Sequence, residues 1–399
     1  MEQHELAFLM LLKEAMWQGH PSEAGKERLR QAGAEPVMRL AFPHNLVPLI
    51  GSMVLEAVPE DPGYQQLRQQ VRGTAVRQAM ATGEFLTLTE AFQREEIPFL
   101  VIKGAFCRSL YPNPALRPSS DEDILVPEGE LARAEAMLQS MGYTRGKEGE
   151  EDAVHSWYGK TLYVELHRQL MPEPTLRGVD VQSRFFGCFD RNMKFTFDGR
   201  SFATLGANDN LLFLVLHYYK HFLAGGVGIR QLCDIVLFAD RYRAELNQDT
   251  IWQDLRQFKL EVFFQNLLDI GVQYLGLDPE ILPVPRELGT ADSGELLQDI
   301  LEAGVFGGST MERRHSGNIT IQAAKSGKEK NILTAMFPPP ASIQGRYPYL
   351  RRHPWLVPVA WCSRGITYLR RDKNALANGL DSARLGQQRI KLLKKYGIL

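Results

Sequence analysis

The 399-residue sequence is poor in cysteine and has almost no net charge, and each shortage excludes a class of protein. Its four cysteines, Cys107, Cys188, Cys233 and Cys362, lie too far apart for a compact disulfide framework or a paired metal-ligand motif. They favour a reducing compartment, and we expect the protein to be cytoplasmic. Because 46 basic residues nearly balance 47 acidic ones, no overall field would draw the protein onto nucleic acid or an anionic membrane.

Long apolar runs are missing too. No stretch reaches the roughly 18 uninterrupted apolar residues that a membrane-spanning helix needs, which predicts no integral membrane association. Residues 1–19 hold a short apolar patch between acidic flanks, unlike a secretory signal, and their periodicity predicts a buried amphipathic helix. The oligomeric state stays open.

Several common catalytic motifs are absent as well. The sequence has no Walker-type Gly-Lys-Ser/Thr loop, no dinucleotide-binding glycine fingerprint and no nucleophile-elbow sequence. These absences argue against kinases, dehydrogenases and hydrolases of the common types. No His/Cys cluster predicts a zinc site.

The residues that are present predict an α+β protein of more than one average domain. A hydrophobic fraction of 44% and a charged fraction of 23% are ordinary for a globular chain. We expect a small catalytic module with a short mixed sheet, residues 96–204, embedded in a mostly helical body. That body comprises an N-terminal helical cap at residues 1–95, a helical domain at 205–345 and a basic, aromatic helical tail at 346–399. Strands are predicted at residues 99–102, 121–126, 153–158 and 161–167, and a hairpin at 193–204.

Three carboxylates in the predicted strands point to metal chemistry. Alternation along a strand places Asp121 and Asp123 on one face and Glu122 on the other. Paired hard oxygen ligands of this kind suit Mg²⁺. In another strand, Glu165 shares its face with His167 and would supply a third carboxylate. Three carboxylates on neighbouring strands predict a site for phosphoryl transfer with Mg²⁺, or Mn²⁺ in its place.

Polar residues just before these carboxylates favour phosphate binding. Lys103 and Gly104 lie where a strand is expected to end and a helix to begin, so a cation and free backbone N–H groups would face one region. Arg117, Ser119 and Ser120 precede the acidic pair, and the arginine fork would hold triphosphate oxygens.

Each pattern also has an ordinary structural explanation. An Asp-x-Asp before an apolar strand is often a solvated loop edge, and a Lys-Gly after a strand is often a plain turn. Glu165 is harder to explain in this way, because a carboxylate in a central strand is costly unless it is paired or metal-bound.

The run from Ile102 to Tyr143, with the later segment VELH, resembles the uncharacterised bacterial nucleotidyltransferase family of the polymerase-β-like superfamily. That family carries a Lys-Gly strand end, a Tyr-Pro, an Arg, an Asp-x-Asp and an acidic-x-His. The matching residues here are Lys103 and Gly104, Tyr111 and Pro112, Arg117, Asp121 and Asp123, and Glu165 and His167. The resemblance spans about residues 95–360. It implies a polymerase-β-like module whose three acids ligate the metal, with His167 among the residues that contact the nucleotide.

Two features depart from the superfamily pattern. Most members carry Gly-Ser where this chain has Lys103 and Gly104, and an apolar residue where it has Glu122. Lys-Gly is typical of this branch, but the glutamate is not. A charge on the core face of the strand needs a partner, so either the strand is exposed there or Glu122 has another role. The third acid is Glu rather than the commoner Asp.

The helical half adds a second polar set. His217, Lys220 and His221 share one helix face, and Arg230 and Asp234 are similarly spaced in the next helix. We expect the helical domain to pack directly on the module and form one wall of the cleft, with Lys220 and His221 contacting the nucleotide. A polar network between helices would explain the same residues.

The tail interleaves basic and aromatic residues, which suit an RNA or membrane surface but also ordinary solvated helix faces. Residues 305–331, rich in glycine, predict a mobile loop before it.

These observations predict a Mg²⁺-dependent enzyme that transfers a nucleoside monophosphate from an NTP, such as ATP, to an unidentified acceptor and releases pyrophosphate. The acceptor is a small molecule, a protein or a tRNA. The alternative is a nucleotide-binding regulatory or scaffold protein without catalysis.

Overall fold

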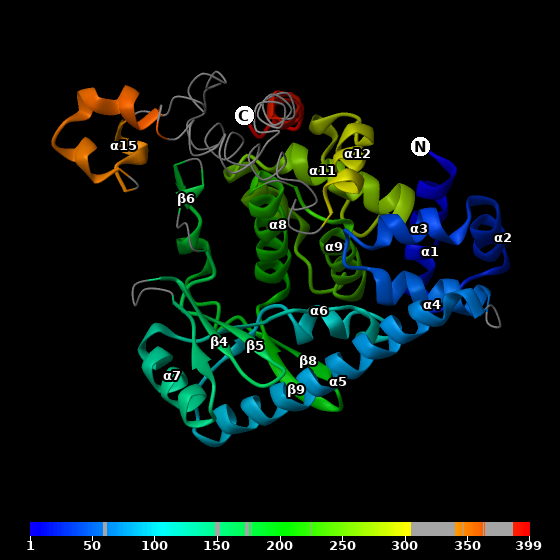
Figure 1. Ribbon diagram of the computed structural model, residues 1–399, viewed down its shortest axis with the longest axis horizontal. Coiled ribbons are helices and arrows are strands. Elements are labelled where there is room, and N and C mark those ends of the chain that lie inside the picture. The colour runs from blue at the N-terminus through cyan, green and yellow to red at the C-terminus, as the bar shows by residue number, and fades with distance from the viewer. Residues whose placement is uncertain are drawn as a thin grey trace. The chain divides into compact units, whose positions relative to one another are not determined.

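The computed structural model describes residues 1–58, 62–147, 152–171, 175–176, 178–224, 226–304, 340–345, 347–361, 363 and 386–399 (Figure 1). The chain forms two compact units. The first comprises residues 1–218 and 229–293, and the second comprises residues 219–228 and 294–399. Helices combined with a small mixed sheet confirm the α+β class. The finer division at residues 95, 204 and 345 stays a prediction.

Helices precede the sheet in the first unit. α1 begins at a capping box, in which the Glu2 backbone N–H donates to the Glu5 carboxylate over 2.8 Å. It buries Phe8, Leu11 and Leu12 completely, as expected of the amphipathic helix predicted at this end. The helices of this segment are α1 (Gln3–Trp17), α2 (Glu23–Ala32), α3 (Ala34–Ala41), α4 (Val47–Ala57) and the long α5 (Gln65–Arg94).

A five-stranded sheet forms the centre of the first unit, in the order β1-β2-β5-β4-β3. β2 and β5 run parallel and the other pairs antiparallel, which confirms the mixed sheet. α6 (Ala105–Ser109) follows β1, and α7 (Leu131–Ser140) follows β2. All four residues of β2 are buried, so elements cover both of its faces. The strands are β1 (Leu100–Val101), β2 (Glu122–Leu125), β3 (Thr144–Arg145), β4 (Val154–Tyr158) and β5 (Tyr163–His167).

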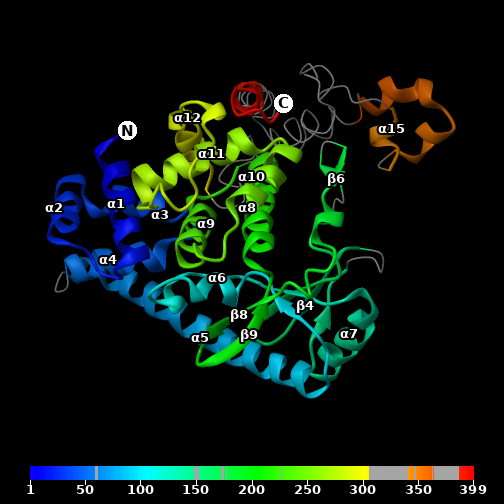
Figure 2. The same cartoon turned by 180° about the vertical axis from the view of Figure 1, so that it is seen from behind.

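The predicted hairpin consists of β8 (Met193–Phe197) and β9 (Arg200–Thr204). Asp198 and Gly199 form its turn with φ of 49° and 72°, the left-handed backbone that a two-residue hairpin favours. The ring of Phe195 lies 5.1 Å from Phe106 of α6, and Phe202 lies 5.4 Å from Phe85 of α5. The hairpin therefore joins α5 and α6 through one aromatic cluster. Figure 2 shows β8 and β9 beside α5 from behind. A shorter pair, β6 (Thr175–Leu176) and β7 (Val179–Asp180), lies between the sheet and the hairpin in sequence.

Further helices complete the first unit. The Trp17 indole of α1 donates to the Leu275 carbonyl over 2.7 Å, so the two ends of this unit are joined. Phe238 of α9 packs 5.9 Å from Phe106, which places α9 against α6. The helices after the hairpin are α8 (Ala207–Ala224), α9 (Ile229–Arg241), α10 (Gln248–Gln257) and α11 (Glu261–Ile270).

The second unit contains the end of α8, α12 (Gly294–Ala303), α15 (Pro340–Ile343) and a helix over residues 386–395. Tyr396 is buried, and its hydroxyl accepts a hydrogen bond from the Leu296 N–H over 3.1 Å. Lys395 pairs with Glu295 over 2.8 Å at the surface. These contacts match the solvated-face interpretation of the tail at its end. The loop predicted at residues 305–331 and the tail's Arg370-Arg371 pair lie outside the described residues.

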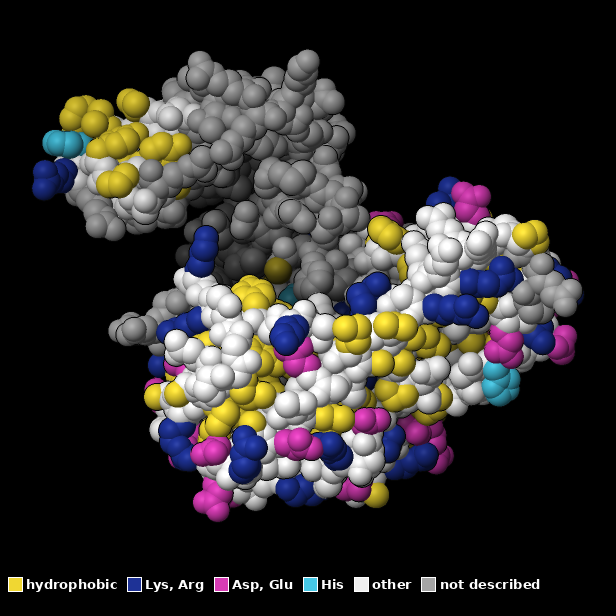
Figure 3. Space-filling model, turned by 60° about the horizontal axis from the view of Figure 1, so that its bottom comes forward, with side chains coloured by type: hydrophobic (Ala, Val, Ile, Leu, Met, Phe, Trp, Pro, Cys, Tyr) yellow, Lys and Arg dark blue, Asp and Glu magenta, His cyan; other side chains and the backbone are white. Residues whose placement is uncertain are grey.

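The surface of the first unit carries no large field of one sign on the face of α5. Figure 3 shows basic and acidic side chains interspersed there, in keeping with the balanced composition. None of the helices in the described ranges combines the length and the apolar character that crossing a bilayer requires.

Candidate active site

The predicted acidic residues meet where β2 and β5 run side by side. Asp123 is in register with Glu165, and His167 follows two residues later on the same face. Ligand atoms of Asp123, Glu165 and His167 all lie within 4.8 Å of one another. The parallel pairing of β2 and β5 thus brings Asp123 together with groups that lie 42 and 44 residues further along the chain.

Asp123 lies at the centre of this group and is 2% exposed. Its Oδ1 is 3.1 Å from Nε2 of His167, and that nitrogen is 3.8 Å from the Glu165 carboxylate. Oδ2 of Asp123 accepts no hydrogen bond, and the Lys103 ammonium, 3.4 Å away, forms only an ion pair with it. Lys103 itself is 14% exposed. The cluster therefore has the Lys103 cation at its edge, and Oδ2 of Asp123 can still accept a hydrogen bond or a metal ion.

Neighbouring charges set the protonation of these groups. Burial raises the pKa of Asp123, but Lys103 and His167 lower it below its ordinary value. Burial raises the pKa of Glu165, and the Asp123 and Asp121 carboxylates raise it further. Burial lowers the pKa of Lys103, but Asp123 and Asp121 raise it above its usual range. The surroundings thus favour the ionised form of Asp123 and shift Glu165 toward its protonated form.

A divalent cation fits this donor set. Carboxylate oxygens suit Mg²⁺ and Mn²⁺, and an imidazole nitrogen is a common ligand of transition metals. Oδ2 of Asp123 is a buried acceptor with no hydrogen bond and only the ion pair to Lys103, so it can also accept a metal ion. The compact group contains His167 in addition to the predicted Asp123 and Glu165, whereas Asp121 lies outside it.

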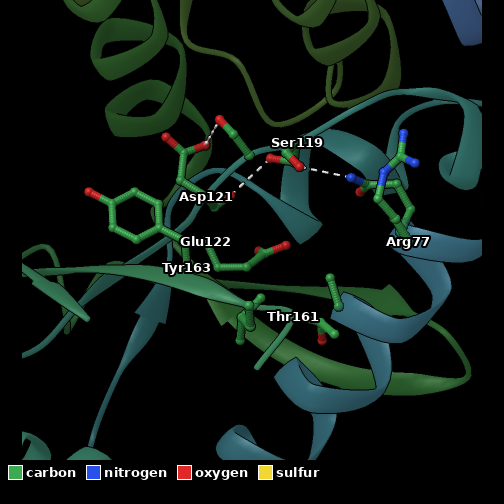
Figure 4. Close-up of a pocket in the computed structure, with 10 residues that line it drawn as sticks. Arg77, Ser119, Asp121, Glu122, Thr161 and Tyr163 are labelled. Atoms are coloured by element: carbon green, nitrogen blue, oxygen red, sulfur yellow. Dashed lines mark hydrogen bonds between the residues drawn. The ribbon is translucent and has the colours of Figure 1, made fainter. Parts of the chain in front are cut away.

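Asp121 lies just before β2 and borders a pocket of about 160 Å³. Its carboxylate accepts a hydrogen bond from the Ser120 hydroxyl over 3.3 Å, and its carbonyl accepts one from Ser119 over 2.9 Å. Figure 4 shows Asp121 and Tyr163 on one side of this pocket and Arg77 of α5 on the other. The structure places the two predicted serines in contact with Asp121. Nucleotide binding by these serines stays a prediction.

Glu122 has a structural partner, which the sequence left open. Its Oε1 accepts a hydrogen bond from Arg108 over 2.6 Å, and its Oε2 accepts one from the Ala105 N–H over 2.6 Å. Burial raises the pKa of Glu122, and the Arg108 guanidinium opposes that shift. The strand is therefore not exposed at Glu122. The same contact corrects the expectation of free backbone N–H groups after Gly104, because the Ala105 N–H is already occupied.

Arg117 is also engaged, contrary to the expectation that its fork holds triphosphate. Nε and Nη2 of Arg117 donate to the two carboxylate oxygens of Asp234 on α9, at 3.1 and 2.5 Å. The Tyr111 hydroxyl donates to the same carboxylate over 2.9 Å. All three side chains are buried. This network corrects the role of Arg117: it anchors the segment before Asp121 to α9.

The predicted polar residues of α8 are divided between the two units. His217 is half-buried and belongs to the first unit, with its ring 6.0 Å from Phe213. Lys220 is exposed and His221 half-buried, and both belong to the second unit. Their contact with the nucleotide stays a prediction.

One polar chain beside the cluster was not assigned from the sequence. The Tyr163 hydroxyl donates to Oε1 of Glu165 over 3.1 Å and lies 2.8 Å from the Ser156 hydroxyl on β4. Ser156 is in register with Glu165. The alternation of side chains along β4 was therefore the sequence signal that could have placed Ser156 next to Glu165. Tyr163 lies two residues before Glu165 in β5, and its hydrogen bond orients the Glu165 carboxylate.

Comparison with known proteins identifies the group to which the fold and site belong. A family profile described as "Uncharacterised nucleotidyltransferase" matches residues 30–276. None of the curated proteins matches the chain in sequence. Among solved structures, the lincosamide antibiotic adenylyltransferase LnuA, bound to lincomycin, is similar with 14% identity and a TM-score of 0.29, over 39% of this chain and 94% of that one. Antibiotic-resistance factor ANT(2'')-Ia is similar with 10% identity and a TM-score of 0.33, over 44% and 92%.

Proposed function

The chain belongs to the uncharacterised nucleotidyltransferase family, and we propose that it transfers a nucleoside monophosphate from an NTP to an acceptor hydroxyl, phosphate or amine. The observation that supports this most directly is the convergence of Asp123, Glu165 and His167 beside Lys103. Such a group combines metal ligands with a cation for phosphate oxygens. The four scattered cysteines lead us to place the reaction in the cytoplasm.

The reaction forms a bond between the acceptor atom and the α-phosphorus and breaks the bond from that phosphorus to the bridging oxygen. Pyrophosphate leaves with the electron pair. When bound, Mg²⁺ or Mn²⁺ supplies positive charge to the attacking and leaving oxygens. Asp123 and Glu165 would hold the cation, with His167 and Asp121 as further donors. Lys103 neutralises charge that develops on the leaving phosphates.

The alternative role of Glu165 is that of the base, which takes the proton of a hydroxyl or amine acceptor. Its raised pKa brings it closer to the range in which a carboxylate removes a proton effectively. It is also the most accessible acid of the cluster, with 30% of its side chain exposed against 3% for Asp123. Tyr163 holds the carboxylate in place through its hydroxyl.

The test follows label from each α-³²P-labelled NTP, with Mg²⁺ or Mn²⁺, into small acceptors and into macromolecules of a bacterial lysate. Pyrophosphate is measured in parallel. Asp123→Asn should reduce transfer by about a hundred-fold or more, because a metal ligand is lost. Glu128→Gln is the matched control, since this acid follows β2 and its side chain is 71% exposed. A variant lacking Asp123 that transfers as fast as the parent would refute the mechanism.

The same assay addresses the acceptor and the non-catalytic alternative. Label on a protein or on tRNA identifies a macromolecular acceptor, and label in a small product identifies a metabolite. A pure binder would retain intact NTP over hours. An unpaired Glu122 in this strand would favour that alternative, but Glu122 is paired with Arg108.

A further inference from the structure

One buried cation of the first unit has no acidic partner. Arg230, on the first turn of α9, is 7% exposed. Its Nη1 donates to the Pro118 carbonyl, and its Nε has no hydrogen-bond partner. Among the described residues it forms no ion pair with a carboxylate. A guanidinium held in this way is costly, because its charge is removed from water and no described carboxylate contacts it directly.

The nearest carboxylate on its own helix is already engaged. Asp234 receives both arms of the Arg117 fork and the Tyr111 hydroxyl. The cluster thus contains two guanidinium groups and one carboxylate, and Arg117, Arg230 and Asp234 are each more than nine-tenths buried. One positive charge is left over.

This excess charge lies close to the catalytic strand. The carbonyl that Arg230 contacts belongs to Pro118, three residues before Asp121. Burial and the neighbouring Arg117 lower the pKa of Arg230, whereas Asp234 and Asp121 raise it. The field of Asp121 therefore reaches this guanidinium.

We propose that Arg230 is a polyphosphate-binding residue, which compensates its buried charge with the phosphate oxygens of the nucleotide. This inference rests on the proposed function and gives Arg230 the task that the sequence assigned to Arg117. The two arginines share a loop but differ in partners: Arg117 fastens the loop to α9 through Asp234, and Arg230 keeps its charge for a ligand. A planar guanidinium suits phosphate oxygens because it offers several donors in one plane.

Equilibrium binding tests this without an acceptor. Magnesium tripolyphosphate, Mg-ATP and adenosine are titrated calorimetrically into the full chain, into Arg230→Gln and into Arg241→Gln. Arg241 is the matched control, because it lies on α9 and also donates to a backbone carbonyl, that of Ser109, but is exposed. We expect Arg230→Gln to weaken binding of tripolyphosphate and ATP about ten-fold to a hundred-fold, the usual effect of losing a charged hydrogen bond. Adenosine, which lacks phosphate, should bind all three proteins alike.

Equal affinity of Arg230→Gln and the parent for tripolyphosphate would overturn the inference. If Arg230→Gln does not fold, Arg230→Lys replaces it, since lysine keeps the charge but loses the fork. Weakening of about three-fold or more by lysine is then expected, and no weakening overturns the proposal. A parent that binds tripolyphosphate through Arg230 but does not consume NTP would refute the proposed function alone. A parent that transfers nucleotide while Arg230→Gln binds ATP normally would refute the role of Arg230 alone.

Discussion

Replacing Glu122 should destabilise the fold rather than remove a catalytic group. The Glu122 carboxylate is 2% exposed and receives hydrogen bonds of 2.6 Å from Arg108 and from the Ala105 N–H. Arg108 is 1% exposed, donates to Thr82 over 2.8 Å and lies 4.9 Å from the Phe197 ring. Its guanidinium is thus held on several sides and has little freedom to reach water. Glu122→Gln leaves that cation buried with no charge to oppose it.

The magnitude follows from the burial of both partners. Removing one member of a buried ion pair costs about 3–5 kcal/mol of unfolding free energy, because the other charge stays desolvated. This is a large part of the roughly 5–15 kcal/mol that stabilises a typical domain. For a unit of this size it lowers the melting temperature by roughly 6–20 °C. The double variant Arg108→Met, Glu122→Leu should recover most of the loss, because no charge is then left unpaired.

Thermal and urea unfolding of the parent, Arg108→Met, Glu122→Leu and the double variant give a double-mutant cycle, and Glu122→Gln is unfolded beside them. Glu90→Gln serves as a control, since the Arg200–Glu90 pair is exposed and should contribute under about 1 kcal/mol. An unchanged melting temperature in Glu122→Gln, together with lost nucleotidyl transfer, would show that Glu122 acts in the reaction and that its pairing with Arg108 is unimportant.

Three further predictions concern the site. Gly104→Ala should cost about 1–3 kcal/mol in urea unfolding, because Gly104 has φ +57° and an added Cβ would lie 2.0 Å from Oε2 of Glu122; a neutral result would contradict this geometry. Tyr163→Phe should weaken Mn²⁺ binding about ten-fold in calorimetry without lowering stability, because the hydroxyl that orients Glu165 is lost, and unchanged affinity would count against that role. Mg²⁺ should raise the melting temperature more at pH 8 than at pH 5. The raised pKa of Glu165 means that folding favours its protonated form. The stability that protonated Glu165 contributes is present at low pH and is lost as pH rises through the folded-state pKa. Above that pKa, the ionised carboxylate can bind the metal instead. This linkage would be refuted by a Mg²⁺-induced rise in melting temperature that does not vary with pH, or by a pH dependence of that rise that persists in Glu165→Gln.

Most of the local structure was predictable because periodicity carries it. The apolar spacing of α1 and α5 and the alternation in β5 and in the β8–β9 hairpin are visible in the sequence and are present in the structure. β1 is shorter than its apolar run suggests. Only Leu100 and Val101 form the ladder with β2, whereas the backbone of Ile102 bonds singly to the Asp123 carbonyl as the chain leaves the sheet. An apolar run indicates which residues are buried, whereas the length of a strand depends on how far the neighbouring strand pairs with it.

Parts of the site were predictable for a similar reason, and its partners were not. Alternation placed Asp123 on one face and Glu165 with His167 on another strand's face, and the parallel pairing of the strands then brought them together. The partner of Arg117 lies 117 residues away in α9, a separation that no local pattern encodes. The sequence does not distinguish Arg117 from Arg230. Only the tertiary structure shows that a carboxylate holds Arg117 and that Arg230 contacts a backbone carbonyl instead.

The two departures from the superfamily pattern belong to a single arrangement. The Glu122 carboxylate occupies the Ala105 N–H at the start of α6, and Gly104 makes room for it, since any Cβ at that position would collide with the carboxylate. The usual Gly-Ser pair would place a serine there, so a glutamate in β2 and a glycine at the strand end suit each other. With that backbone N–H engaged, positive charge for phosphate has to come from side chains. Under our proposals Lys103 supplies it next to Asp123, and Arg230 supplies it from α9. Phosphate binding that depends on two side-chain cations is more sensitive to their substitution than binding by backbone groups, which no single substitution removes.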